Sequence, residues 1–187
     1  HKKTKAKIYY VDTDDLNKTF AIGFKTAPKD SMGMAHIMEH SVLNGSKKYR
    51  SKDPFMDMAS SSLQTFLNAM TYPDKTVFPV SSENDKDFFN LTDVYLDAVF
   101  NPLVLEKKEI LDQEGWHYDL DENGKISSIS GVVYNEMKGA LTDPDTIIYN
   151  DINSYLYKNS PYEHESGGNP EHIIDLTYDK SVSYTHL

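Results

Sequence analysis

Two histidines and a glutamate within five residues are the part of this sequence best suited to chemistry. His36 and His40 are four residues apart, and Glu39 directly precedes the second histidine. On a helix this spacing places both imidazoles on one face, one turn apart, so that both can bind one metal ion. Glu39 lies within reach of a water on that metal without being a ligand itself. The pattern H-x-x-E-H therefore predicts a zinc site that hydrolyses peptide bonds, with Glu39 as the general base for a zinc-bound water.

A catalytic zinc site needs a third protein ligand, and spacing alone does not choose it. The candidates are Glu83, Glu109, Glu114 and Glu136. Glu136 is the most attractive, because it belongs to a predicted helix over residues 131–142 whose apolar side chains imply a packed face. The alternative interpretation is that the motif is a solvated helix face with no metal, since five-residue patterns also arise by chance.

Composition limits the function classes. The chain has 187 residues, a net charge of −10 and no cysteine. The acidic charge argues against nucleic acid or an anionic membrane as the main partner, because both attract basic surfaces. No apolar run approaches the roughly 18 residues that cross a bilayer. Without thiolates, a transition-metal site must use histidine and carboxylate ligands.

Hydrophobic periodicity and turn residues predict an alternation of strands and helices. The predicted strands are residues 5–10, 19–25, 63–72, 75–81 and 116–120. The predicted helices are residues 32–43, a short one from 53, 84–100, 105–112, 131–142 and a start at 170–175. We expect an α+β fold in which helices pack on one face of a largely antiparallel sheet.

Three details of these elements are specific predictions. Asp30 or Ser31 should cap the helix that carries His36. The first two strands should form a hairpin across a turn-rich segment at residues 12–17. Pro79 makes the strand 75–81 an edge or an irregular strand, because proline has no N–H to donate.

Several longer segments around the motif form a recognisable series. They are residues 36–46, 48–49, 52–55, 65–76 (TFLNAMTYPDKT), 94–100 (VYLDAVF), 113–118 (QEGWHY) and 131–139 (GVVYNEMKG). In this order they closely resemble the pitrilysin/insulinase family of inverzincin metallopeptidases, and within it the presequence protease and falcilysin branch. The resemblance extends from about residue 7 to residue 178.

The resemblance implies a role for each matching position. His36, His40 and Glu136 match the zinc ligands, and Glu39 matches the general base. Four residues match an active-site edge strand to which the substrate backbone adds as an extra strand: Asn68, Ala69, Met70 and Thr71. A plain sheet strand without a substrate role is the alternative for that stretch. Many relatives also place a glutamate seven residues before the third ligand, where this chain has Ile129.

The resemblance also implies that the protein is larger than this chain. Members of the branch have two homologous halves, each made of two related α+β domains, and the distal half contributes substrate-binding residues. We therefore expect residues 1–187 to be a zinc-binding N-terminal peptidase domain, an incomplete fragment of a four-domain protein that lacks the C-terminal half of the same chain.

The expected function is that of a zinc metalloendopeptidase acting on unstructured peptides, with Zn²⁺ as cofactor and no nucleic acid or membrane partner. One alternative is a non-catalytic binding or assembly module of the same family, and another is an inactive truncated fragment that only binds zinc. The sequence does not give the compartment, which would be cytoplasmic for a bacterial protein and an organellar matrix for a eukaryotic one.

Overall fold

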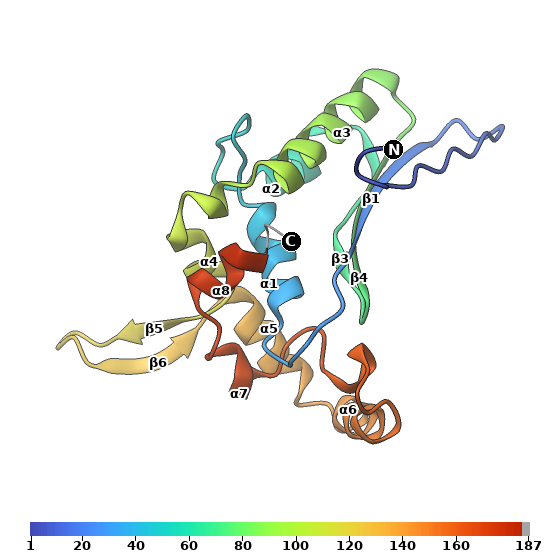
Figure 1. Ribbon diagram of the computed structural model, residues 1–187. Helices are drawn as coiled ribbons and strands as arrows, with labels where there is room; N and C mark the ends of the chain where they lie inside the picture. Colours follow the sequence, from blue (N-terminus) through green and yellow to red (C-terminus); the bar gives the residue numbers. More distant parts are fainter. Residues whose placement is uncertain (185–187) are drawn as a thin grey trace.

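The computed structural model describes residues 1–184, which combine a small sheet with many helices (Figure 1). The strands are β1 (Lys18–Lys25), β2 (Gln64–Leu67), β3 (Met70–Thr71), β4 (Lys75–Ser82), β5 (His117–Leu120) and β6 (Ile126–Ser130). The α-helices are α1 (Met34–Val42), α2 (Pro54–Ser61), α3 (Asp85–Phe100), α4 (Lys108–Glu114), α5 (Val132–Ala140), α6 (Pro144–Leu156), α7 (Pro170–Ile173) and α8 (Tyr178–Tyr184). Short 3₁₀ turns lie at Leu103–Leu105 and Pro161–Glu163.

Strand β4 is the centre of an antiparallel sheet. Its whole length pairs with β1, from Lys18 opposite Ser82 to Lys25 opposite Lys75. Strands β2 and β3 pair with the other side of β4. The prediction of a largely antiparallel sheet is therefore confirmed.

Pro79 accounts for an interruption in this sheet. The predicted strand over residues 63–72 is in fact two short strands, β2 and β3, separated by Asn68 and Ala69. The Pro79 carbonyl accepts a hydrogen bond from the Asn68 N–H on this side of β4. In a strand, the N–H and the carbonyl of one residue point to the same neighbouring strand. Proline has no N–H, so residue 79 cannot donate the second hydrogen bond of this pair to Asn68. Pro79 thus marks an irregularity inside a central strand, so that of the two predicted alternatives the irregular strand is confirmed and the edge strand is not.

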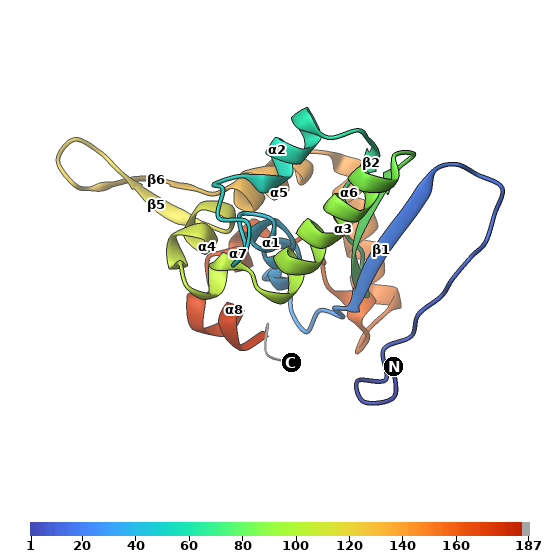
Figure 2. The ribbon, with the colours of Figure 1, turned by 90° about the horizontal axis from the view of Figure 1, so that it is seen from above.

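Helices α1 and α3 pack on the same face of the sheet, as predicted (Figure 2). Helix α3 contributes Leu91, Tyr95 and Ala98, which its periodicity places on one buried side. Helix α1 is more deeply enclosed, since it also contacts α4 and α5. The side chains of Ile37 and Val80 are completely buried between these layers. The helix that carries His36, Glu39 and His40 therefore lies at the centre of the molecule.

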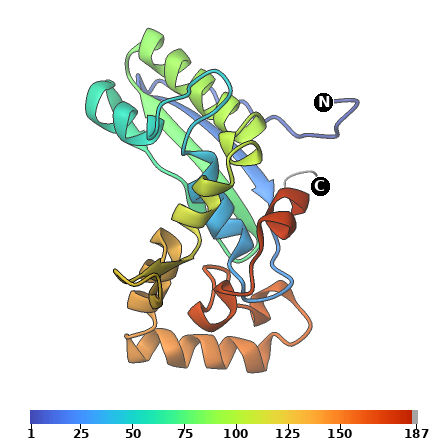
Figure 3. The same cartoon turned by 90° about the vertical axis from the view of Figure 1, so that its left-hand side faces the viewer.

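Two elements extend from this core. The β5–β6 hairpin projects to one side (Figure 1), and α6 lies across one end of the molecule (Figure 3). Neither β6 nor α6 was predicted from the sequence. Strand β6 is serine-rich and mostly exposed, so it carries little apolar signal. Helix α6 does carry a start signal, because the Asp143 side chain accepts a hydrogen bond from Asp145 N and Pro144 follows as the first helical residue.

The predicted strand at residues 5–10 is wrong. These residues form no ladder with β1, and Ile8, Tyr9 and Tyr10 stay exposed. The Lys5 N–H donates instead to the carbonyl of His1, which turns the chain at its start. The apolar residues of this segment predicted a strand, but a strand also needs a partner along its edge.

The predicted cap of helix α1 is also wrong. The helix begins at Met34 and is preceded by Gly33 in a left-handed conformation, with no side-chain cap. The Asp30 carboxylate accepts from Met32 N, inside the preceding turn. The Ser31 carbonyl accepts a hydrogen bond from the N–H of Asn169, from a distant loop.

Among residues 1–184, no helix is long and apolar enough to cross a membrane.

Candidate active site

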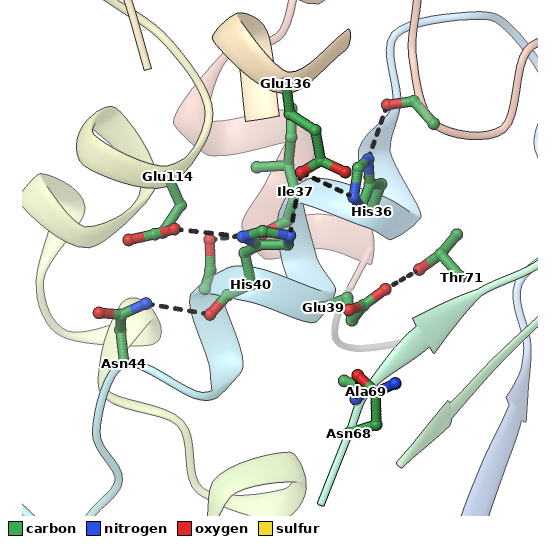
Figure 4. Close-up of polar contacts among 12 residues, drawn as sticks. His36, Ile37, Glu39, His40, Asn44, Asn68, Ala69, Thr71, Glu114 and Glu136 are labelled. Carbon is green, nitrogen blue, oxygen red and sulfur yellow. Dashed lines mark hydrogen bonds and ion pairs between the residues drawn. The ribbon is translucent and has the colours of Figure 1, made fainter. Parts of the chain in front are cut away.

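Helix α1 presents two imidazoles toward one point. His36 and His40 lie on the same side of the helix, with ring centroids 5.0 Å apart and the rings nearly perpendicular. Their Nε2 atoms each lie 3.7 Å from Glu136 Oε2. Figure 4 shows the Glu136 carboxylate directly facing both rings. The predicted helical spacing therefore produces the expected convergence of side chains.

Glu136 comes from α5, which is anchored beside α1. Val133 and Met137 are buried on the inner side of α5, and the Glu136 side chain lies on a half-exposed neighbouring side. This anchoring fixes the helix while leaving the carboxylate accessible from solvent.

The donor set fits a zinc ion. Within the described part of the chain, His36, His40 and Glu136 are the one group of three or more histidine and acidic residues whose ligand atoms all lie within 4.8 Å of one another. Ligand atoms about 2.1 Å from a tetrahedral zinc are separated by roughly 3.4 Å. The observed 3.7 Å from each Nε2 to the carboxylate oxygen is close to that separation.

Three further glutamates that could have supplied the third ligand lie outside this group. Glu83 and Glu109 are exposed and have no place in it. Glu114 is buried but contacts a different nitrogen of His40.

In both histidines, the Nδ1 atom contacts an oxygen on the side of the ring away from Glu136. His36 Nδ1 lies 3.0 Å from the Gly167 carbonyl oxygen, and His40 Nδ1 lies 3.4 Å from Glu114 Oε2. Because these oxygens accept, each Nδ1 carries a proton, and each Nε2 is the nitrogen directed toward Glu136. An acceptor behind a metal-binding histidine fixes the ring and increases its basicity. Glu114 thus supplies a buried supporting carboxylate behind His40.

The pKa of His40 reflects these neighbours. Burial lowers it, but the hydrogen bond to Glu114 and the charges of Glu39, Glu114 and Glu136 outweigh burial, so that the pKa is raised above 6.5. The surroundings of His40 therefore favour a positive charge at this point. A bound metal cation would be stabilised by the negative charges of the same carboxylates.

Glu39 is buried and held by one oxygen. The Thr71 hydroxyl donates a hydrogen bond of 2.6 Å to Glu39 Oε2 (Figure 4). Thr76 Oγ1 lies 3.4 Å from the Thr71 hydroxyl and 2.8 Å from Thr26 Oγ1, so that hydroxyls of three neighbouring backbone segments are linked. The Thr71 hydroxyl binds Oε2 of Glu39 and does not bind Oε1.

The predicted substrate strand lies beside Glu39. Met70 and Thr71 pair with β4, while Asn68 and Ala69 occupy the break between β2 and β3. The buried Tyr95 hydroxyl donates to the Asn68 carbonyl over 3.1 Å. Burial raises the pKa of Tyr95, so this hydroxyl remains protonated and able to donate. Helix α3 therefore fixes the sheet edge next to Glu39, through the hydrogen bond from Tyr95 to the Asn68 carbonyl.

Three of these contacts were not predicted from the sequence. Glu114 was considered as a ligand and not as a support for His40, and Thr71 as part of a substrate strand and not as a partner of Glu39. The Gly167 carbonyl is a backbone group 131 residues from His36, and no side-chain pattern could reveal it.

Comparison with known families identifies the family of this chain. The family described as Insulinase (Peptidase family M16) matches residues 19–127. This chain belongs to that peptidase family. The matched residues include His36, Glu39 and His40 and end before Glu136. The inclusion of Glu136 in the site therefore depends on the geometry described above.

Individual proteins are also similar in sequence to this insulinase-family chain. It is 53% identical over 184 residues to the protein HypA of Clostridium perfringens, with 98% of this chain and 19% of that protein covered. It is 49% identical over 180 residues to presequence protease 1, chloroplastic/mitochondrial, of Arabidopsis thaliana, covering 96% of this chain and 17% of that protein. The chain thus spans less than a fifth of the length of these relatives.

Solved structures share the fold. The crystal structure of pitrilysin matches with a TM-score of 0.66 at 23% identity, over 94% of this chain and 17% of that chain. The periplasmic protease PqqL from Escherichia coli matches with a TM-score of 0.66 at 18% identity, over 91% of this chain and 18% of that chain. The α+β architecture of the insulinase family therefore applies to this chain.

Proposed function

We propose that this chain is the zinc-binding N-terminal domain of a metalloendopeptidase that cleaves unstructured peptides. The observation that carries the proposal is the convergence of His36, His40 and Glu136, with the buried Glu39 carboxylate on the same helix as the histidines. Membership of a peptidase family and relatives named presequence protease support the peptide substrate.

The metal would be held by His36 Nε2, His40 Nε2 and a Glu136 oxygen. A zinc ion in such a site polarises the scissile carbonyl and lowers the pKa of a bound water to about 7. Glu39 takes the proton of the attacking water with the oxygen that Thr71 leaves free. It then returns this proton to the leaving amine, because one carboxylate can act first as base and then as acid.

The substrate would lie along the edge formed by Asn68, Ala69, Met70 and Thr71. The break opposite Pro79 leaves Asn68 and Ala69 outside the regular ladder, beside Glu39. An extended peptide can add to such an edge through main-chain hydrogen bonds, which are insensitive to side-chain identity. This arrangement would favour flexible substrates, since only an unfolded segment has free main-chain groups.

The rest of the enzyme would lie outside this chain. Relatives are more than five times longer, and we assign further domains and substrate-positioning groups to the remaining length. A non-catalytic binding or assembly module is less favoured, because such a module has no need for four chemically matched side chains at one place.

The full-length protein that contains this chain tests the catalytic role. It should cleave a quenched fluorescent flexible peptide, and Glu39→Gln should reduce turnover by about 10²-fold or more, the usual contribution of a general base. The variant should retain its zinc, measured by elemental analysis, because Glu39 is not a ligand. Equal turnover by Glu39→Gln and the parent protein would refute the assignment.

A further inference from the structure

A distant loop packs against the start of helix α1. The Asn169 N–H donates to the Ser31 carbonyl over 2.8 Å, and the Gly167 carbonyl oxygen lies 3.0 Å from His36 Nδ1. This loop therefore contacts both the turn that leads into α1 and the first histidine of the site. The second contact requires the loop backbone to come very close to the helix start.

Gly33 permits that close approach. It has φ +68°, and a Cβ at this position would lie 2.6 Å from Gly167 O and 2.9 Å from Gly168 Cα. Both distances are shorter than van der Waals contact, and both involve backbone atoms that cannot rotate away. The oxygen that a Cβ would displace is the one bonded to the imidazole of His36.

The Gly167 carbonyl determines how His36 presents its lone pair. A carbonyl only accepts, so it selects the form of His36 with the proton on Nδ1 and leaves Nε2 free toward His40 and Glu136. Loss of such a supporting acceptor typically weakens metal binding by roughly 10–100-fold.

From this contact we propose that Gly33 is a positioning residue of the metal site, because the missing Cβ allows the Gly167 carbonyl to hold the His36 ring. The proposal deepens the function proposed above and rests on it for the identity of the metal. The carbonyl contact itself exists without the metal, and it can therefore be measured separately.

Gly33→Ala is the direct test, with Gly124→Ala as its matched control. Gly124 has φ +75°, close to that of Gly33, but a Cβ there meets nothing within 4 Å. The two variants share the cost of a left-handed alanine and differ in the contact with Gly167 O. Zinc affinity is measured by competition with a chelator. The position of the proton on His36 is measured by imidazole ¹⁵N NMR of the metal-free chain at about pH 8, where imidazoles are largely neutral.

Gly33→Ala should bind zinc roughly 10–100-fold more weakly and should lose the preference for the Nδ1 proton on His36. Gly124→Ala should match the wild type in both measurements. Wild-type zinc affinity together with a wild-type ¹⁵N spectrum in Gly33→Ala would overturn the proposal. If the wild type binds no zinc, the proposed function fails, and the ¹⁵N comparison still decides the role of Gly33.

A second variant covers the case in which Gly33→Ala does not fold, as judged by circular dichroism. A Cβ on Gly168 would lie 2.9 Å from Gly33 Cα and 2.9 Å from the side chain of Ile173. The Ile173 side chain can rotate away and the Gly33 backbone cannot, so that Gly168→Ala separates the same two backbone segments from the other side. It should change zinc affinity and the His36 spectrum in the same direction. No change in either measurement in folded Gly168→Ala would overturn the proposal.

Discussion

At the scale of single residues, His36 and His40 are supported by acceptors of different charge. His36 donates to a neutral carbonyl, whereas His40 faces the buried carboxylate of Glu114. The pKa of His40 is raised for this reason, and the protonated form of this histidine is favoured in the folded, metal-free chain. Its stability should therefore depend on pH through His40.

We predict that the metal-free chain loses stability as pH rises above 6.5. A group whose pKa is raised by folding stabilises the folded state fully below its unfolded value, here 6.5, and loses this contribution as pH rises through the raised value. Thermal unfolding across this range in the presence of a chelator measures the effect. Glu114→Gln should flatten the dependence, and an unchanged slope in this variant would contradict the assigned cause.

The hydroxyl of Thr71 is a second single group that matters at the site, because it orients Glu39. A hydrogen bond to a charged group contributes about 1.5–3 kcal/mol, so that Thr71→Val should lower the turnover of the full-length protein by about tenfold or more. Zinc affinity should not change, and Thr71→Ser, which keeps the hydroxyl, should restore most of the activity.

Thr19→Val is the matched control for Thr71→Val. The Thr19 hydroxyl lies 2.8 Å from that of Ser81, across the β1–β4 ladder and outside the candidate site. If both valine variants reduce turnover equally, the Thr71 hydroxyl has no special role.

At the scale of elements, α3 supports the sheet edge where we place the substrate. Tyr95 is fully buried, and its hydroxyl bonds the Asn68 carbonyl at the break between β2 and β3. The helix thus fixes backbone atoms that β4 cannot hold, since Pro79 offers no donor on that side.

Tyr95→Phe should lower the free energy of unfolding by about 1 kcal/mol and should raise the KM of the full-length protein for a flexible peptide. Tyr178→Phe is its control, since the Tyr178 hydroxyl bonds the carbonyls of Val104 and Leu105 away from the site. An equal rise in KM in both variants would show that Tyr95 acts only through overall stability.

Helix periodicity and motif spacing were sufficient to predict α1, α3, α5 and the pair of imidazoles. These features depend on residues close together in sequence, where spacing determines which side chains share a face. The start of α1 was predicted wrongly, because the turn before it is held by a distant loop, whose Asn169 N–H donates to the Ser31 carbonyl.

The predicted strand at residues 5–10 failed for a related reason. Its apolar, β-branched and aromatic residues suit a strand, but pairing depends on a free neighbouring edge. The choice of Glu136 over Glu83 and Glu109 from spacing alone was likewise impossible, since the packing of α5 against α1 brings Glu136 to the histidines.

At the scale of the whole molecule, the chain places a candidate zinc site between the sheet and the helices α4 and α5. It covers less than a fifth of the length of its relatives, yet all three candidate ligands lie within it. Zinc binding should therefore be a property of this chain by itself, separable from peptide cleavage by the longer protein.

A crystal structure of the zinc-soaked chain, with anomalous scattering recorded at the zinc edge, is the decisive measurement for this site. We predict one zinc ion, with His36 Nε2 and His40 Nε2 at about 2.0–2.1 Å and a Glu136 oxygen at about 2.0–2.2 Å. A zinc ion bound by a different carboxylate, or the absence of zinc at His36 and His40, would refute the proposed metal site.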